Sequence, residues 1–485
     1  MKIYPKQSTW SNTSSSIGIH FSWYFLSLIV NVAISFIKSP IYTDLFSPNE
    51  FGLYSLVLIS FTIFSMFLLN FSSSAIWRFH IKAKQENSIE KLYSTIISLI
   101  LISGFFLITA SLFISTFAEK LILKKLIVFG AFYFITNELV NIIIIHLKIE
   151  GKSARYSIIT SIQLLISFGI LLFLTFVLHQ GIESFFSSII LSNIIILIWL
   201  TIKFRSYRIF IFPRIDKSFF SMIIEYSKLA LIVDFVFYIF KNIDRYLIQY
   251  FKGISETGLY NQIYNIADLT IFSIITIFFS AITPKYFNLL ESKVSKDIFS
   301  KKYKNLLGLY LIIFLPVCTY LSLYSREICH ILFRGEFRNY SHILPPIIFS
   351  NLFFGLLQFN AIKFRFENKR KLMYISYISS LVFNILLNII LLNLTSFEVA
   401  ATVTLISYIG LFGFFYFYDL KNYLDKACLS PLMIPIIILI IQIVIHLSIK
   451  YFFKIDSILF AFIEGLIFAI SYFLMTKERS INLST

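Results

Sequence analysis

Four charged side chains interrupt one long apolar stretch of the sequence, ALIVDFVFYIFKNIDRYLIQY at Ala230–Tyr250: Asp234, Lys241, Asp244 and Arg245. Spacings of seven and four residues place Asp234, Lys241 and Arg245 on one face of an α-helix. Asp244 follows Lys241 by three residues and can pair with it. A charge at the centre of a membrane-spanning helix costs about 2.5–3.5 kcal/mol. These side chains therefore need either one another or a water-filled cavity.

Cations at these positions could bind an anionic ligand, because Lys and Arg pair readily with phosphate groups. Asn31, Ser35 and Lys38 recur at helical spacing in the first apolar stretch of the chain. Each half of the chain would then contribute a cation from its first helix. We predict that a cavity-lining set binds the substrate: Lys38, Lys241, Arg245 and Asn31.

Carboxylates inside apolar stretches could bind and release protons or other cations, because burial disfavours the charged form of a carboxyl group. The candidates for such ion coupling are Asp234, Asp268, Asp244 and Glu138. In an alternative interpretation, these carboxylates and the neighbouring cations neutralise one another as a structural ion-pair network. Uncharged polar stripes either line the same cavity or join neighbouring helices by hydrogen bonds, as at Ser376, Ser380, Asn384 and Asn388.

The composition indicates the class of protein to which these residues belong. The chain has 485 residues, of which 58% are hydrophobic and only 14% are charged, and its mean hydropathy is +0.82. An ordinary soluble domain carries about 25% charged residues. Apolar runs of roughly 20 residues, the length that crosses a bilayer as a helix, recur along the whole sequence. The sequence therefore predicts an all-α integral membrane protein.

The apolar runs predict about fourteen membrane spans. We place them at residues 17–42, 51–77, 92–117, 121–146, 156–178, 182–202, 225–250, 258–283, 305–324, 343–362, 372–393, 398–418, 429–449 and 456–475. The first span is long and contains Lys38 and Pro40, and the fourth begins among Lys124 and Lys125, so an error in either would change the topology.

A short phrase occurs once in each half of the chain, as EFGLY at Glu50–Tyr54 and as ETGLY at Glu256–Tyr260. Two further matches follow in the same order, Lys91–Ile102 with Lys301–Ile312 and Lys148–Lys152 with Arg365–Lys369. We interpret them as an internal duplication of six helices, an even number that leaves both copies running in the same direction. The predicted domains are two parallel six-helix lobes around a central cavity, 1–207 and 208–424, and two C-terminal spans in 425–485. We expect the glycines of the phrase to form a tight turn or a close helix contact, and its tyrosines to lie at the membrane interface.

The net charge of +17 would suggest nucleic acid in a soluble protein. Here most of the Lys and Arg residues fall in alternate loops, which fixes both termini on the cytoplasmic side by the positive-inside rule. The densest basic loops are Lys203–Lys228, Lys285–Lys304 and Lys363–Lys371. We expect them to contact anionic lipid head groups, and we expect no nucleic-acid partner.

Enzymatic chemistry has no support in the sequence. The three cysteines Cys318, Cys329 and Cys428 show no metal-binding spacing, so no metal site is predicted. Phosphate-binding glycine loops and nucleophile elbows are missing as well, so we expect no cofactor and no catalytic residues. The N-terminal segment lacks a secretory cleavage pattern and is expected to stay attached.

The stretch FKNIDRYLIQYFKGISETGLYNQIYNIADL at Phe240–Leu269, and its echo SPNEFGLYSLVLISF at Ser47–Phe61, resemble the O-antigen flippases, the Wzx-type polysaccharide-repeat-unit exporters of the MATE-like MOP exporter superfamily. The span count agrees with that family, and the resemblance covers essentially the whole chain. It implies movement of an undecaprenyl-pyrophosphate-linked oligosaccharide to the outer leaflet of a bacterial inner membrane, by alternating access coupled to protons or other cations. Lys38, Lys241 and Arg245 would then attract the pyrophosphate.

Three other functions remain open from the sequence. A lipid II flippase would share the span number and basic cavity, whereas a multidrug exporter of the same superfamily would need an acidic one. A non-transporting membrane scaffold for polysaccharide assembly is the alternative from a different class. The partners that we expect are the lipid-linked oligosaccharide, membrane lipids, and a polysaccharide polymerase with its chain-length proteins.

Overall fold

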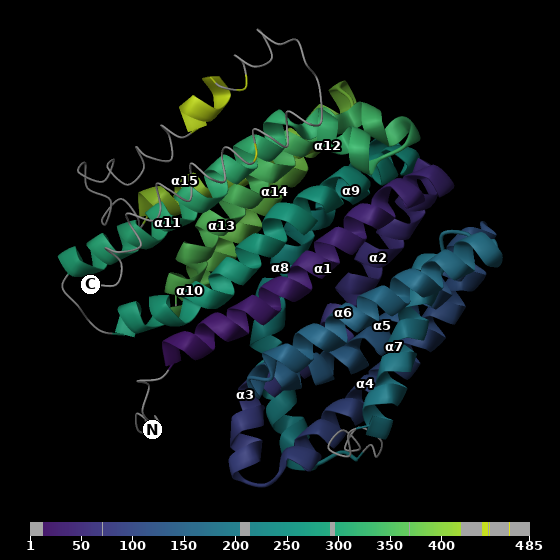
Figure 1. Ribbon diagram of the computed structural model, residues 1–485, viewed down its shortest axis with the longest axis vertical. Coiled ribbons are helices and arrows are strands. Elements are labelled where there is room, and N and C mark those ends of the chain that lie inside the picture. Colours follow the sequence, from purple (N-terminus) through teal and green to yellow (C-terminus); the bar gives the residue numbers. More distant parts are fainter. Residues whose placement is uncertain are drawn as a thin grey trace. The chain divides into compact units, whose positions relative to one another are not determined.

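The computed structural model describes residues 13–69, 71–203, 214–291, 296–367, 369–418, 439–444, 446 and 465. Every regular element in these ranges is a helix, and they contain no strand (Figure 1). The predicted all-α class is therefore confirmed. The predicted lobe boundary at 207/208 and most of the C-terminal segment 425–485 lie outside the described residues.

The chain forms two compact units, Met1–Asn242 and Ile243–Thr485. The first unit contains α1 (Thr13–Leu45), α2 (Pro48–Leu68), α3 (Phe71–Gln85), α4 (Ile89–Thr116), α5 (Leu121–Ile149), α6 (Ser153–Leu172), the π-helical turn η1 (Phe173–Val177) and α7 (Ser184–Lys203). The division between the units falls within α8 (Lys217–Phe251). The second unit continues with α9 (Ile254–Ala267), the π-helical turn η3 (Asp268–Phe272), α10 (Ser273–Glu291), α11 (Lys296–Leu323), α12 (Ser325–Leu332), the 3₁₀ segment η4 (Gly335–Ile343), α13 (Leu344–Phe366), α14 (Arg370–Leu394) and α15 (Val399–Tyr418).

Corresponding helices pair in the same way within each unit. In the first unit α5 packs against α4 and α7, and α7 packs against α6. In the second unit α13 packs against α11 and α15, and α15 packs against α14. This repeated pairing is what a duplication of six spans predicts.

Eleven helices in the described residues are long and apolar enough to cross a membrane. They coincide with eleven of the predicted spans, and the fourth is among them at Leu121–Ile149. The predicted seventh span is present as the helix α8, but it is not among the eleven. The predicted thirteenth and fourteenth spans lie mostly outside the described residues, so the predicted count of fourteen is not reached here.

The second predicted span, 51–77, is wrong in its extent. The structure ends α2 at Leu68 and begins a separate helix, α3, at Phe71. The α3 sequence, FSSSAIWRFHIKAKQ, is far more polar than that of α2, and it carries Lys82 and Lys84 in its last turn. Its buried face, with Phe71, Ile76 and Phe79, packs in an apolar cluster with α4 and α5, and α3 is a short helix at the loop end of the unit.

The repeated phrase marks the start of a helix in both units. Ser47 caps α2, and its hydroxyl and backbone N–H both contact the carboxylate of Glu50 in a capping box. In the second unit Gly253 takes the capping position with φ +118°, a conformation that glycine adopts without strain, and Glu256 stands three residues later. Gly52 and Gly258 therefore lie inside the first helical turns, and the expected tight turn at these glycines is not observed.

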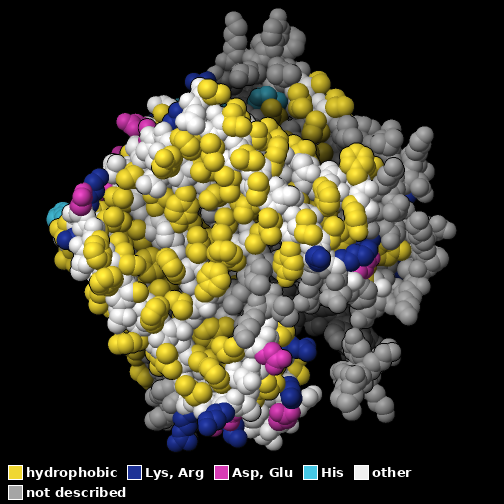
Figure 2. Space-filling model, turned by 180° about the vertical axis from the view of Figure 1, so that it is seen from behind, with side chains coloured by type: hydrophobic (Ala, Val, Ile, Leu, Met, Phe, Trp, Pro, Cys, Tyr) yellow, Lys and Arg dark blue, Asp and Glu magenta, His cyan; other side chains and the backbone are white. Residues whose placement is uncertain are grey.

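Large apolar side chains cover the outer surface of the described helices. Phe105, Phe113 and Ile102 on α4 are each more than half exposed, as are Leu386 and Ile390 on α14. Figure 2 shows hydrophobic side chains over most of one face, with charged side chains gathered mainly at its edges. Such a surface is stable in contact with lipid and would be costly in water.

Close packing inside the second unit leads to a stability prediction at Gly355. A methyl group added to Gly355 on α13 would collide with the Tyr310 ring of α11, and the Tyr310 hydroxyl is held by a hydrogen bond to the Leu352 carbonyl. We expect Gly355→Ala to destabilise the protein by about 1–3 kcal/mol, the usual cost of overpacking. Gly410→Ala on α15, where the added methyl meets no atom within 4 Å, is the matched control. Thermal unfolding of both purified variants measures the effect, and equal stability of the two would contradict it.

Candidate functional site

An ion pair between two adjacent residues is buried in the second unit. Asp244 and Arg245 on α8 are 1% and 2% exposed, and Arg245 Nη1 lies 2.9 Å from Asp244 Oδ1. Tyr260 on α9 donates a hydrogen bond of 2.6 Å to Asp244 Oδ2, and Thr404 on α15 donates a longer one of 3.5 Å. The carboxylate therefore accepts hydrogen bonds from three helices, which satisfies its charge inside the unit.

Arg245 is held on its other sides by side chains of α9. Its guanidinium lies 3.8 Å from the ring centroid of Tyr264 and 5.6 Å from that of Tyr260. Its Nε donates to Asn261 Oδ1 at 3.3 Å. A planar guanidinium that stacks on an aromatic ring and pairs with a carboxylate is fixed in position. In this arrangement Arg245 shows the structural ion pairing that the sequence left open as an alternative.

Asp268 stands at the point where α9 changes into the π-helical turn η3. Its Oδ1 accepts a hydrogen bond of 3.5 Å from Asn351 on α13. Inserted π turns occur frequently at functional sites because they redirect side chains within a helix. The described position of Asp268 keeps it a candidate for ion coupling.

In the first unit Lys38 has a different environment from that of Arg245. Its Nζ lies 5.5 Å from the Phe168 ring of α6, and no ion pair joins it to any carboxylate among the described residues. The side chain is half-buried within the apolar span Phe25–Leu45. Asn31, on the same helix, accepts a hydrogen bond of 3.5 Å from Ser35. Lys38 is thus a membrane-embedded cation with no described counter-ion.

The repeat relates Lys38 to the buried ion pair. The displacement of 206 residues between Glu50 and Glu256 places Lys38 at the position of Asp244. One unit therefore has a cation where the other has a carboxylate. In the second unit Arg245 neutralises Asp244, whereas Lys38 of the first unit has no described counter-ion.

Glu138 on α5 lies in a group of neutral hydrogen-bond donors. Ser72 and Ser73 of α3 donate to its Oε1, and Asn141 donates to its Oε2 at 3.3 Å. Asn141 also donates to Ser73 at 3.0 Å, which closes the group. No described Lys or Arg forms an ion pair with Glu138. A carboxyl group with neutral partners in an apolar span can change its protonation state without breaking an ion pair.

The two other predicted site residues are less defined. Lys241 is half-buried on α8 and has no ion pair with Asp244, whose described partner is the neighbouring Arg245. The side chain of Asp234 lies outside the described ones. The structure thus brings Asp244 and Arg245 together, with Asp268 close enough to interact electrostatically with Arg245. Lys38 and Glu138 belong to the first unit and have other described contacts. No group of His, Cys, Asp and Glu suited to a metal ion occurs in the described residues.

The sequence did not reveal the partners of the buried charges. Tyr260 was expected at the membrane interface, but it is fully buried and bonded to Asp244. The displacement of sixteen residues from Asp244 to Tyr260 crosses a helix boundary, so helical spacing gives no signal for the contact. The α14 stripe is clearer, since Asn384 donates to Ser407 and Ser380 donates to the Ser407 carbonyl on α15. Those bonds join two helices, as one of the two interpretations proposed.

Comparison with known proteins follows this geometry. Residues 41–342 match the family described as polysaccharide biosynthesis protein. No curated protein matches the chain. Among solved structures, the lipid II flippase MurJ in its inward closed conformation is similar, with a TM-score of 0.64 and 16% identity over 96% of this chain and 100% of that one.

Two further structures are similar at lower scores. An inward-facing multidrug resistance MATE family transporter of the MOP superfamily gives a TM-score of 0.59 at 14% identity, over 83% of this chain and 96% of that one. A MOP superfamily transporter from Pyrococcus furiosus gives 0.53 at 14% identity, over 87% and 100%. These neighbours are a flippase and transporters, not enzymes, and at such identities the likeness establishes the fold. Because the family match spans well over half of its length, the chain belongs to the polysaccharide biosynthesis protein family, as a multi-pass membrane protein with the fold of the MOP superfamily.

Proposed function

We propose that this protein flips polyprenyl-pyrophosphate-linked oligosaccharides, the repeat units of O-antigen or a related polysaccharide, from the cytoplasmic to the outer leaflet of a bacterial inner membrane. The family match over residues 41–342 carries the proposal, because it links the chain to polysaccharide biosynthesis. The fold supports it, since a flippase for another lipid-linked saccharide, lipid II, is similar over nearly the whole chain. Both termini would lie in the cytoplasm, as the distribution of basic residues predicts.

The substrate's pyrophosphate needs a cation that is not already neutralised. Lys38 meets that requirement, because its described contact is an aromatic ring and not a carboxylate. Asn31 lies two turns away on the same helix and offers an amide for sugar hydroxyls. Arg245 and Lys241 are also proposed to contact the pyrophosphate. Arg245 would first have to leave Asp244 in order to reach the substrate.

Coupling to protons is the energy source that we propose for net export. Glu138 is the first candidate, since its partners are neutral and it can gain a proton without leaving a cation unpaired. Asp268 is the second, and Asp244 is a weaker one because its ion pair with Arg245 stabilises the ionised form. The side chain of Asp234 is not described, so it remains a prediction.

A glutamine at position 138 tests this coupling. Glu138→Gln keeps a similar shape and an oxygen that accepts from Ser72 and Ser73, but its amide nitrogen cannot accept from Asn141 and its charge cannot change. We expect the variant to lose the dependence of export on the proton gradient and to slow net export by roughly tenfold or more. Export of radiolabelled lipid-linked sugars in inverted membrane vesicles, with and without a protonophore, measures it. Glu119→Gln, at an exposed carboxylate between α4 and α5, is the control and should keep normal proton dependence.

A deletion strain tests the substrate class. Loss of surface polysaccharide without a change in drug sensitivity is the expected result. Normal polysaccharide with increased drug sensitivity would favour multidrug export instead. Normal surface polysaccharide and normal drug sensitivity, with a loss of polymerase from the membrane, would favour the scaffold. Cell death with a block in peptidoglycan synthesis would favour a lipid II flippase.

A further inference from the structure

A second polar cluster lies at one end of the first unit, where α3 and α5 finish and α4 begins. His80 Nδ1 lies 2.9 Å from the Tyr93 hydroxyl, which in turn lies 3.1 Å from His146 Nδ1. His80 Nε2 lies 3.0 Å from Glu150 Oε1 at the end of α5. His80 and Tyr93 are each 1% exposed. Both imidazoles therefore contact the Tyr93 hydroxyl, and His80 also contacts the Glu150 carboxylate.

The hydrogen bonds of this group can all form with either of two arrangements of the protons, in which the bonds to Tyr93 run in opposite directions. With both imidazoles neutral, His146 Nδ1–H donates to Tyr93, Tyr93 O–H donates to His80 Nδ1, and His80 Nε2–H donates to Glu150. When His80 gains a proton, its Nδ1–H donates to Tyr93, and Tyr93 O–H then turns toward an unprotonated His146 Nδ1. The charged His80 still donates to Glu150. One added proton therefore reverses the chain and breaks none of its hydrogen bonds.

A second proton cannot be accommodated in the same way. With both imidazoles charged, His80 Nδ1–H and His146 Nδ1–H both point at the Tyr93 oxygen, so the Tyr93 O–H can no longer donate to either histidine. The two rings, with centroids 5.3 Å apart, would then repel each other.

The surrounding charges add to this repulsion. The ammonium groups of Lys84 and Lys152 lie 2.6 and 3.8 Å from Glu150, the single carboxylate of the cluster. Hydrogen bonds from Lys84 and His80 lower the pKa of Glu150 from 4.5 to about 2, so Glu150 stays ionised at pH 5 and above. On the α4 and α8 side, Lys91 faces Asp216 and does not join the chain. Two charged imidazoles would therefore face two lysines with one carboxylate between them.

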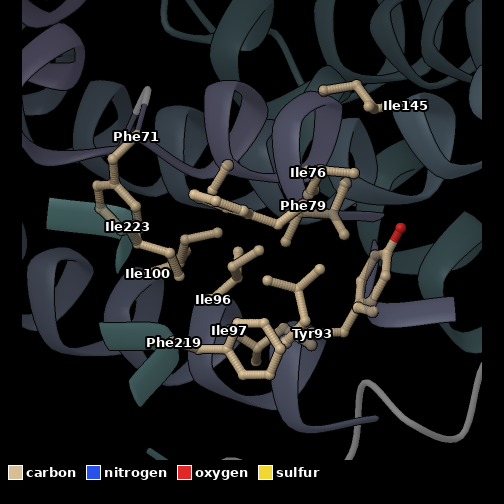
Figure 3. Packing of buried hydrophobic residues seen from close by; sticks show 14 of the residues in the cluster. Phe71, Ile76, Phe79, Tyr93, Ile96, Ile97, Ile100, Ile145, Phe219 and Ile223 are labelled. Carbon is tan, nitrogen blue, oxygen red and sulfur yellow. The ribbon is translucent and has the colours of Figure 1, made fainter. Parts of the chain in front are cut away.

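The packing shows how the hydrogen bonds of His80, Tyr93, His146 and Glu150 hold α3 in position. Tyr93 lies at the edge of a buried apolar cluster from α3, α4, α5 and α8, with its hydroxyl pointing away from Ile97 (Figure 3). His80 and Lys84 come from α3, whereas His146 and Glu150 come from the end of α5. Breaking the chain would remove the histidine contacts that help to fasten the end of α3 to α5, and would leave the ion pair of Lys84 with Glu150.

The second unit has no histidine at the equivalent positions. The displacements of the repeat place Tyr303 at Tyr93, Lys363 at His146 and Glu367 at Glu150. Lys363 and Lys369 lie 3.7 and 2.8 Å from Glu367, so the carboxylate is held in both units. A lysine stays charged across the range, from about pH 5 to 8, in which an imidazole changes its charge. The second unit therefore lacks this pair of imidazoles at the equivalent positions.

We propose that the His80–Tyr93–His146–Glu150 chain is a pH-sensitive latch, which fastens α3 to α5 with one or no added proton and releases α3 when both histidines are charged. It lies on the side that the basic residues predict to be cytoplasmic, so acidification of the cytoplasm would release it. Neither the substrate nor the coupling ion enters this inference.

Hydrogen–deuterium exchange of the full-length protein in phosphatidylethanolamine and phosphatidylglycerol vesicles tests the latch. After correction for the intrinsic pH dependence of exchange, we expect protection of peptides spanning 80–88 and 146–152 to fall about tenfold between pH 7 and pH 5. Peptides spanning 363–369 should keep their protection. His146→Asn offers Tyr93 a neutral amide near the Nδ1 position, and it should abolish the fall.

The controls separate this latch from a general effect of acid. His342→Asn removes an exposed histidine that pairs with Glu398 in the second unit, and it should leave the fall unchanged. If His146→Asn does not accumulate, Tyr93→Phe serves instead, with low protection at both pH values because the shared hydroxyl is missing. Constant protection in the wild type, an equal fall at 363–369, or a fall that persists in His146→Asn would each overturn the proposal.

Discussion

Replacing Lys38 by alanine is expected to reduce export of the lipid-linked oligosaccharide by about 10- to 100-fold, while the protein accumulates normally in the membrane. The magnitude follows from the loss of one charge-assisted contact to phosphate, worth about 1.5–3 kcal/mol. Normal accumulation is expected because Lys38 has no described ion pair whose loss would strand a partner. Surface polysaccharide in a complemented deletion strain, divided by the amount of protein in the membrane, measures the effect.

Two further variants make this test specific. Lys38→Arg keeps the charge and should retain most of the export. Lys203→Ala removes another lysine that lies over an aromatic ring, Trp199, at 5.0 Å, but at the end of α7. It should therefore export normally. Full export by Lys38→Ala would remove Lys38 from the site, and equal losses in Lys38→Ala and Lys203→Ala would indicate a general effect of lost charge.

Asp244→Ala is expected to lower the free energy of unfolding by about 3–5 kcal/mol, because it leaves the Arg245 guanidinium buried without its carboxylate. Tyr260 would lose its acceptor in the same variant. Removal of both charges, in Asp244→Leu with Arg245→Met, should cost much less, since no buried charge is left unpaired. Unfolding of the purified proteins in detergent compares the three.

The double variant also decides the role of Arg245. If it is stable and exports normally, the pair is structural and Lys38 is the cation that matters. If it is stable but inactive, at least one of the two charges acts in transport, as Arg245 would if it left Asp244 to contact the substrate. A stable Asp244→Ala protein would contradict the structural account, because the charge of Arg245 would then have to be satisfied elsewhere.

The all-helical fold could be predicted from the sequence because a bilayer imposes a length and a polarity on each span. The α2/α3 boundary could not be predicted, since the apolar run continues through Leu68 and Leu69 and the break follows from packing beside α4 and α5. Apolar length locates a span but does not show where its helix ends.

The site could be predicted only in part, for a related reason. Helical spacing relates residues within one helix, so it paired Asp244 with Lys241, whereas Asp244 pairs with the adjacent Arg245 in the structure. The apolar run around Lys38 did identify it as an embedded cation. The contacts that decide their roles are between helices, as in the bonds of Tyr260 to Asp244 and of Ser72 to Glu138. His80 lies three residues beyond the second predicted span and His146 is the last residue of the fourth, and 66 residues separate them. Their pairing therefore became visible only in the folded unit.

The location of the lipid-linked repeat units tests the central claim most directly. In spheroplasts of the deletion strain, and of the same strain carrying the gene, a membrane-impermeant periodate reagent oxidises only the sugars on the outer leaflet. We expect repeat units to accumulate in a protected form without the protein and to become accessible when it is restored. Repeat units that are equally accessible in both strains would contradict the flippase assignment.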